Sequence, residues 1–97
     1  MRQILIGDII AAARSLLEVP PQAWAQTATT MLDHAHMADK VVKRTGVPHR
    51  KWGNGSLMAA AFPTPKSAEP FLNNPAYIEA MHLVLQQLIA WRRANRR

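Results

Sequence analysis

The densest group of residues that could do chemistry lies at positions 44–56, in the sequence RTGVPHRKWGNGS. Glycines let a backbone approach a phosphate closely, and the free N–H groups of a following helix favour an anion. Nearby cations would add charge, and an indole would offer a stacking face. The segment is therefore a candidate binding site for an anion, a nucleic acid or a protein partner, with these candidate residues: Arg44, His49, Arg50, Lys51, Trp52, Asn54 and Ser56.

The same segment also fits a purely structural role. Gly53-Asn54-Gly55 would turn the chain, Ser56 would cap a helix, and Trp52 would anchor the loop in the core. The phosphate-binding pattern GxxxxGK[ST] is absent, and no predicted strand precedes the segment. The structural interpretation is the simpler one, and both binding interpretations stay open beside it.

The string RTGVPHRKWGNGSLMAAA, at 44–61, resembles a segment of small uncharacterised proteins from marine alphaproteobacteria. In those proteins an R-T-G, a His, a W-G-[ND]-G-[ST] turn and an L-M-A helix start recur. The later Pro75-Ala76-Tyr77 is also similar. The resemblance extends over most of the chain and implies no activity, because that family has no assigned function.

A second group, in the sequence DHAHMAD, has residue types that bind metals. On a helix, Asp33, His36 and Asp39 fall on nearby positions at three-residue spacing, and Glu79 and His82 could add ligands from another helix. The motif H-E-x-x-H is absent. A solvent-exposed helix face explains these residues more simply, so we predict no metal and no other cofactor.

Catalytic motifs do not stand out. No serine lies in G-x-S-x-G, Ser56 is expected to be engaged as a cap, and the six acids suggest no buried pair for acid/base work. We therefore predict that the protein is not an enzyme.

Composition narrows the class of protein. A length of 97 residues with 48% hydrophobic residues fits one globular domain, taken as 1–97, and the absence of cysteine excludes disulfides and thiolate metal sites. No apolar stretch is long enough to span a membrane, and Asp8 and Arg14 interrupt the apolar start, so we predict a cytoplasmic protein. The net charge of +6 comes from two spots, one at 40–51 and one in the last six residues. Both spots coincide with predicted helix ends, where cations are favoured in any case.

Helical periodicity divides the chain. Asp8 is expected to cap a helix over about 8–18, with Gly7 separating it from the residues before, and Val19-Pro20-Pro21 ends that helix. A long helix over 21–45 follows, ended by Gly46, and its apolar stripe contains Trp24, Ala28, Met31, Ala35, Ala38 and Val42.

Two further helices are predicted, over 56–62 and 75–93, the last one capped by Asn74-Pro75. The proline-rich stretch 63–74 between them should be an extended connector, with Phe62, Phe71 or Leu72 in the core. The wide apolar face of the last helix is broad enough to contact two helices, or one helix and a second subunit. The fold class is therefore all-α: a small bundle of three main helices and one short helix, with a basic glycine-rich loop.

The lack of catalytic motifs and the broad apolar faces of the helices favour a small helical adaptor or regulator that binds another protein. The bound protein could be a second copy of the chain, which would make a homodimer. The alternative is a nucleic-acid-associated accessory protein that uses the basic 44–56 loop and the C-terminal arginines. Against the alternative, no recognisable helix-turn-helix joins two helices of suitable length.

Overall fold

The computed structural model describes residues 2–61 and 68–95, and in these residues the fold is all-α, with no β-strand. Four α-helices and one short 3₁₀ helix follow one another along the chain: α1 (Ile6–Leu16), η1 (Pro21–Ala23), α2 (Trp24–Thr45), α3 (Leu57–Ala61) and α4 (Pro75–Ala94). No helix of these described ranges has both the length and the apolar character needed to cross a membrane.

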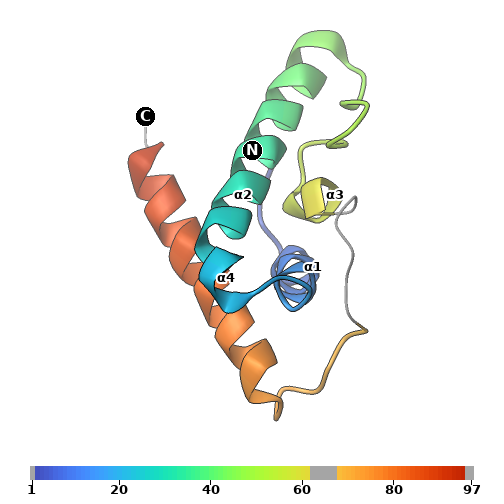
Figure 1. Ribbon diagram of the computed structural model, residues 1–97. Helices are drawn as coiled ribbons and strands as arrows, with labels where there is room; N and C mark the ends of the chain where they lie inside the picture. The colour runs from blue at the N-terminus through green and yellow to red at the C-terminus, as the bar shows by residue number, and fades with distance from the viewer. Residues whose placement is uncertain (1, 62–67, 96–97) are drawn as a thin grey trace.

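The two long helices, α2 and α4, lie side by side, and α1 is seen nearly end-on beside them (Figure 1). Both α1 and α2 pack against α4, and both also contact α3. The core lies between these elements, where Leu16, Leu32, Leu57, Tyr77 and Val84 are fully buried.

The helix α2 has the stripe that its periodicity predicts. Five of the six stripe residues are buried and Val42 is half-buried. Gly46 ends the helix in the left-handed conformation, with φ 75°, and its N–H donates to the carbonyl of Val42. The predicted start is different, because residues 21–23 form the 3₁₀ turn η1 and the α-helix begins at Trp24.

The helix α1 begins at Ile6, two residues earlier than predicted, so Gly7 lies inside the helix and does not separate it from the residues before. Asp8 is consequently not the N-cap but a residue of the first turn. Its carboxylate accepts the N–H of Leu5 at 2.8 Å and also the N–H of Met58, in α3, at 2.9 Å. One buried carboxylate, 5% exposed, therefore caps two helices.

The connector before α4 differs from the prediction in what it buries. Phe71 is 86% exposed and Leu72 is 64% exposed, so neither contributes to the core; Phe62 lies outside the described residues. Asn74 caps α4 as predicted, since its side-chain oxygen accepts the N–H groups of Ala76 and Tyr77. The chain thus places two large apolar side chains on the surface just before α4.

Candidate functional site

The loop between α2 and α3 is a tight turn held by its own backbone. The N–H of His49 donates to the carbonyl of Gly53 at 2.8 Å, and the N–H of Gly53 donates back at 3.1 Å. Gly53 and Gly55 have φ of 82° and 99°, values that side chains disfavour. A Cβ on Gly55 would also lie 2.8 Å from the Cα of Asp39, so the turn packs directly on α2.

Trp52 does anchor this loop, but through ring stacking. Its indole lies between the imidazoles of His34, from α2, and His49, with ring centroids 4.0 and 4.4 Å away and interplanar angles of 7° and 4°. The Nδ1 of His49 accepts the N–H groups of Lys51 and Trp52, both at 3.0 Å, which fixes its ring. Both faces of Trp52 are therefore covered, and neither can stack on a base.

The position of His34 affects its protonation. Burial lowers the pKa of this imidazole below the ordinary value, and the positive charge of Lys51 lowers it further. The neutral ring is accordingly favoured within the stack.

Two N–H groups at the start of α3, where an anion was expected to bind, donate within the chain. The N–H of Met58 donates to Asp8, and the N–H of Ala59 donates to the hydroxyl of Ser56 at 3.1 Å. Asn54 in turn accepts the N–H of Ser56. Asp8 thus supplies the negative charge that a helix start favours, and Ser56 is the predicted cap.

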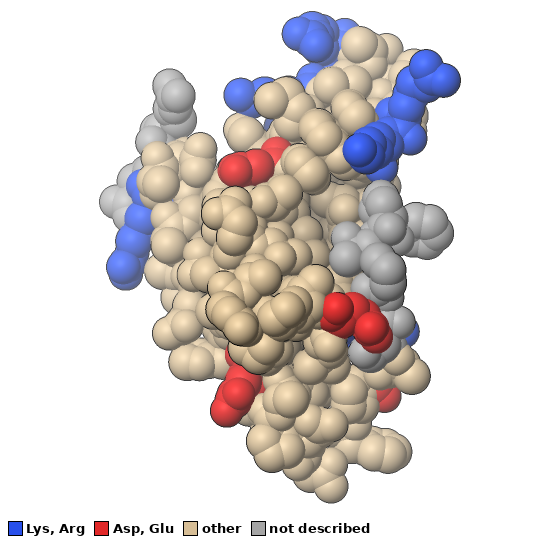
Figure 2. Space-filling view, viewed as in Figure 1, with Lys and Arg blue, Asp and Glu red and all other residues tan. Residues whose placement is uncertain are grey.

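Basic side chains surround this loop. A hollow of about 460 Å³ is lined by His49, Arg50, Lys51, Gly53, Asn54, Ser56, Met58 and Ala59. Arg44 is exposed in the last turn of α2. In Figure 2 the basic groups gather over the end of α2 and the following loop, with a second group at the end of α4. The basic side chains are the part of this site best placed for a phosphate, because the N–H groups of Met58 and Ala59 and the faces of Trp52 are engaged.

The three residues of α2 considered for a metal each contact another side chain of the protein. Asp33 accepts a hydrogen bond from the Nε1 of Trp91 at 2.8 Å, and His36 packs edge-on against the same indole at 5.1 Å. Asp39 is buried and forms an ion pair with Lys43 at 3.0 Å. Burial raises the pKa of Asp39, but the hydrogen bond from Lys43 and neighbouring positive charge outweigh it, so the pKa lies below the ordinary value. Within the described residues no group of three or more such side chains could hold a metal ion.

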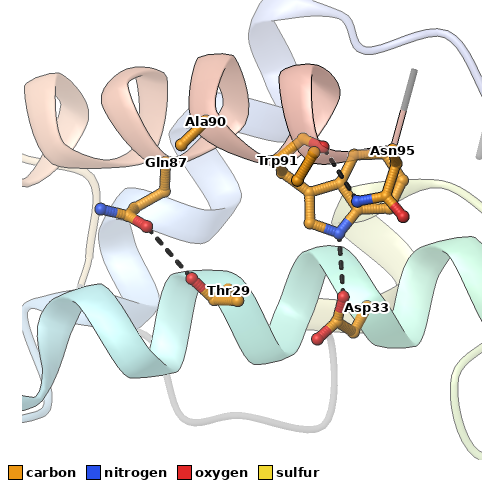
Figure 3. Close-up of a pocket in the computed structure, with 7 residues that line it drawn as sticks. Thr29, Asp33, Gln87, Ala90, Trp91 and Asn95 are labelled. Carbon is orange, nitrogen blue, oxygen red and sulfur yellow. Dashed lines mark hydrogen bonds between the residues drawn. The ribbon is translucent and has the colours of Figure 1, made fainter.

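A hollow of about 310 Å³ lies between α2 and α4, and polar side chains bond to one another beside it (Figure 3). Thr29 donates to Gln87 at 3.1 Å, and the indole of Trp91 extends from α4 to donate to Asp33 on α2. The side-chain amide of Asn95 donates to the carbonyl of Trp91. These groups bond to one another and join the end of α4 to α2, so they serve the fold.

A third hollow, of about 420 Å³, is mostly apolar and lies where α1, the connector and the start of α4 meet. It is lined by Ile6, Ile10, Glu69, Pro70, Phe71, Leu72, Tyr77 and Met81. Ile6, Phe71 and Leu72 are 67%, 86% and 64% exposed. This site was not predicted from the sequence, because Phe71 or Leu72 was expected in the core and Gly7 was expected to separate the residues before it from the first helix.

Exposed side chains of α4 extend this apolar region along the helix. Ile78, Leu85 and Ile89 are 48%, 43% and 53% exposed. Met81, which lines the hollow, is three residues after Ile78 and four before Leu85, so the three side chains are neighbours on the helix surface. We call the whole region the apolar surface; it comprises Ile6, Phe71, Leu72, Ile78, Met81, Leu85 and Ile89.

Comparison with known proteins identifies a family but no activity. No curated protein and no solved structure matches the chain. One family model matches residues 2–88, almost the whole length. The chain therefore belongs to the family described as Domain of unknown function (DUF7742).

Proposed function

We propose that this domain is a non-catalytic interaction module, an adaptor or regulator that binds another polypeptide through the apolar surface. The proposal rests on the observation that many large apolar side chains lie on the surface, whereas the core is rich in alanine. Among the described residues, nine of the seventeen buried apolar residues are alanine, whereas ten large apolar residues are exposed. Contiguous exposed apolar patches on a soluble domain are typical of interaction sites.

The shape of the apolar surface supports the same function. The hollow between α1 and the connector is a concave site for an apolar side chain, and the stripe on α4 beside it is a convex helix face. Burial of exposed apolar area stabilises a complex by about 25 cal/mol per Å² before the costs of association. Phe71 is suited to act as an anchor, because large aromatic side chains dominate the energetics of many interfaces.

The experiment is photo-crosslinking in the native host. A photoreactive phenylalanine analogue replaces Phe71, and in a control strain it replaces Met37, which is 50% exposed on α2 away from the apolar surface. We expect position 71 to yield one dominant adduct, identified by mass spectrometry, that is absent from position 37. Ile6→Glu should abolish the adduct, and Met37→Glu should not. Identical adduct patterns from both positions, or an adduct insensitive to Ile6→Glu, would overturn the proposal.

A second candidate function, association with nucleic acid, is supported by the gathering of basic groups in Figure 2. Such binding would rest on phosphate contacts, since the faces of Trp52 are covered. It would weaken steeply with salt and with the double substitution of Arg50 and Lys51 by Ala. Absence of binding to duplex and single-stranded oligonucleotides at low salt, measured by fluorescence anisotropy, would rule it out.

A further inference from the structure

We infer that the polypeptide covering the apolar surface is a second copy of this chain, and that the two copies pair through α4 in an antiparallel, two-fold arrangement. The inference rests on the proposed function, because it names the partner of the same surface. Three properties of α4 and of the molecular surface carry it: the spacing of the exposed stripe, the charges at the two ends of the helix, and the accessible area.

The spacing of the stripe suits an antiparallel copy of itself. Ile78, Leu85 and Ile89 lie within about 40° of one another around the helix. A two-fold axis level with Leu85 and Gln86 would place Ile89 of the second copy opposite residues 82–83. That position lies between Ile78 and Leu85, so Ile89 would fill the gap between them, as knobs fill holes in paired helices. The two Leu85 side chains would meet near the axis.

The charges of α4 favour the antiparallel direction. Glu79, in the second turn, is the one acid of the helix, and Arg92 and Arg93 lie in its last turn. Glu79 and Arg93 are separated by about 21 Å along the helix and about 40° around it, so they lie on the same edge of the stripe. The same two-fold axis brings each Glu79 level with Arg93 of the other copy. A parallel pair would instead bring four arginine side chains together, and their like charges would repel one another.

The accessible area is large enough for such a pair. The surface is 6273 Å², whereas a monomeric protein of 10.8 kDa averages about 5,500 Å² by the usual scaling with mass. A surface above that average is expected of a chain that covers part of it by pairing, and a stable interface buries roughly 800 Å² on each partner. Phe71 and Ile6, which flank the start of α4, would add to the helix contact on each side.

The test is the mass of the purified chain in solution, measured by sedimentation velocity and light scattering from micromolar to near-millimolar concentrations. We expect a concentration-dependent species of twice 10.8 kDa. Leu85→Glu should give a monomer with an unchanged far-UV circular dichroism spectrum, and Met37→Glu, at an equally exposed apolar position on α2, should leave the dimer intact. A monomer at every concentration, or a dimer that Leu85→Glu does not weaken, overturns the inference.

Charge reversal tests the direction of pairing. Glu79→Arg and Arg93→Glu should each raise the dimer dissociation constant about tenfold, and the double variant should restore most of the affinity. Failure of the double variant to recover overturns the antiparallel arrangement. The crosslinking experiment separates the two ideas: a monomer whose position 71 still captures a different protein refutes the dimer and retains the proposed function.

Discussion

Replacement of Asp8 by alanine should destabilise the fold strongly, although it removes only a small side-chain volume. Its carboxylate is 5% exposed and accepts the N–H of Leu5 at 2.8 Å and the N–H of Met58 at 2.9 Å. The first bond caps the N-terminus of α1, and the second caps the N-terminus of α3. Asp8→Ala removes both acceptors at once and leaves both N–H groups without them.

The expected loss follows from these two bonds. A hydrogen bond to a charged group contributes about 1.5–3 kcal/mol, and loss of a helix cap costs about 1 kcal/mol. Because both bonds share one carboxylate, we expect Asp8→Ala to lower the free energy of unfolding by about 3–4 kcal/mol. Asp8→Asn keeps one acceptor oxygen and should lose about 2 kcal/mol. A domain of this size is stable by about 5–15 kcal/mol, so both variants should still fold.

The assay is urea unfolding followed by far-UV circular dichroism at one fixed protein concentration, with amide hydrogen exchange as a local readout. Asp33→Asn is the matched control, since Asp33 is exposed and the asparagine oxygen can still accept the Trp91 hydrogen bond. The control should change the free energy of unfolding by less than about 0.5 kcal/mol. The reasoning is refuted if Asp8→Ala unfolds like the control, or if the Met58 amide stays as protected as in the unmodified chain.

Two further predictions concern the loop and its stack. Gly55→Ala should cost about 3 kcal/mol or more, because φ is 99° and the added Cβ would lie 2.8 Å from the Cα of Asp39; Gly46→Ala, with φ 75° and no atom within 4 Å, should cost only about 1–2 kcal/mol. Both costs are measured by the urea unfolding described above, and equal costs would contradict the close packing of Gly55. Because the folded pKa of His34 lies below 6.5, the unfolded chain binds the proton first, so stability should fall as pH drops below 6.5 until the folded pKa is passed. NMR titration of His34 should give a midpoint below 6.5 that rises in Trp52→Ala, and a midpoint at or above 6.5 would show that the stack does not bury the imidazole.

The helices could be predicted from the sequence because their signals are local. Periodic apolar residues, a glycine at the end of α2 and Asn74-Pro75 before α4 each act over a few residues. The start of α1 could not be placed in this way, because Asp8 resembles an N-cap in sequence. Its second hydrogen bond, to Met58, joins residues fifty positions apart, and no local pattern reports such a contact.

The candidate site was predicted only in part, for a related reason. The residues of the 44–56 loop were identified, and Ser56 is the cap that they implied. The partner that covers one face of Trp52 is His34, which comes from α2, and no local pattern in the sequence pairs these two residues. The exposure of Phe71 was missed because a large aromatic residue after a proline-rich stretch is usually assigned to a core.

The alanine-rich core bears on how stability and association would be linked. A buried alanine contributes less apolar area than leucine or phenylalanine, so close helix packing here stabilises the fold less per residue. The larger apolar side chains on the surface, such as Phe71 and Leu85, contribute fully only when a partner covers them. If that partner is a second copy, unfolding must also break the pair, and the melting temperature should rise with protein concentration. The same rise should disappear in Leu85→Glu, which ties the stability of the fold to the surface that we propose as its interface.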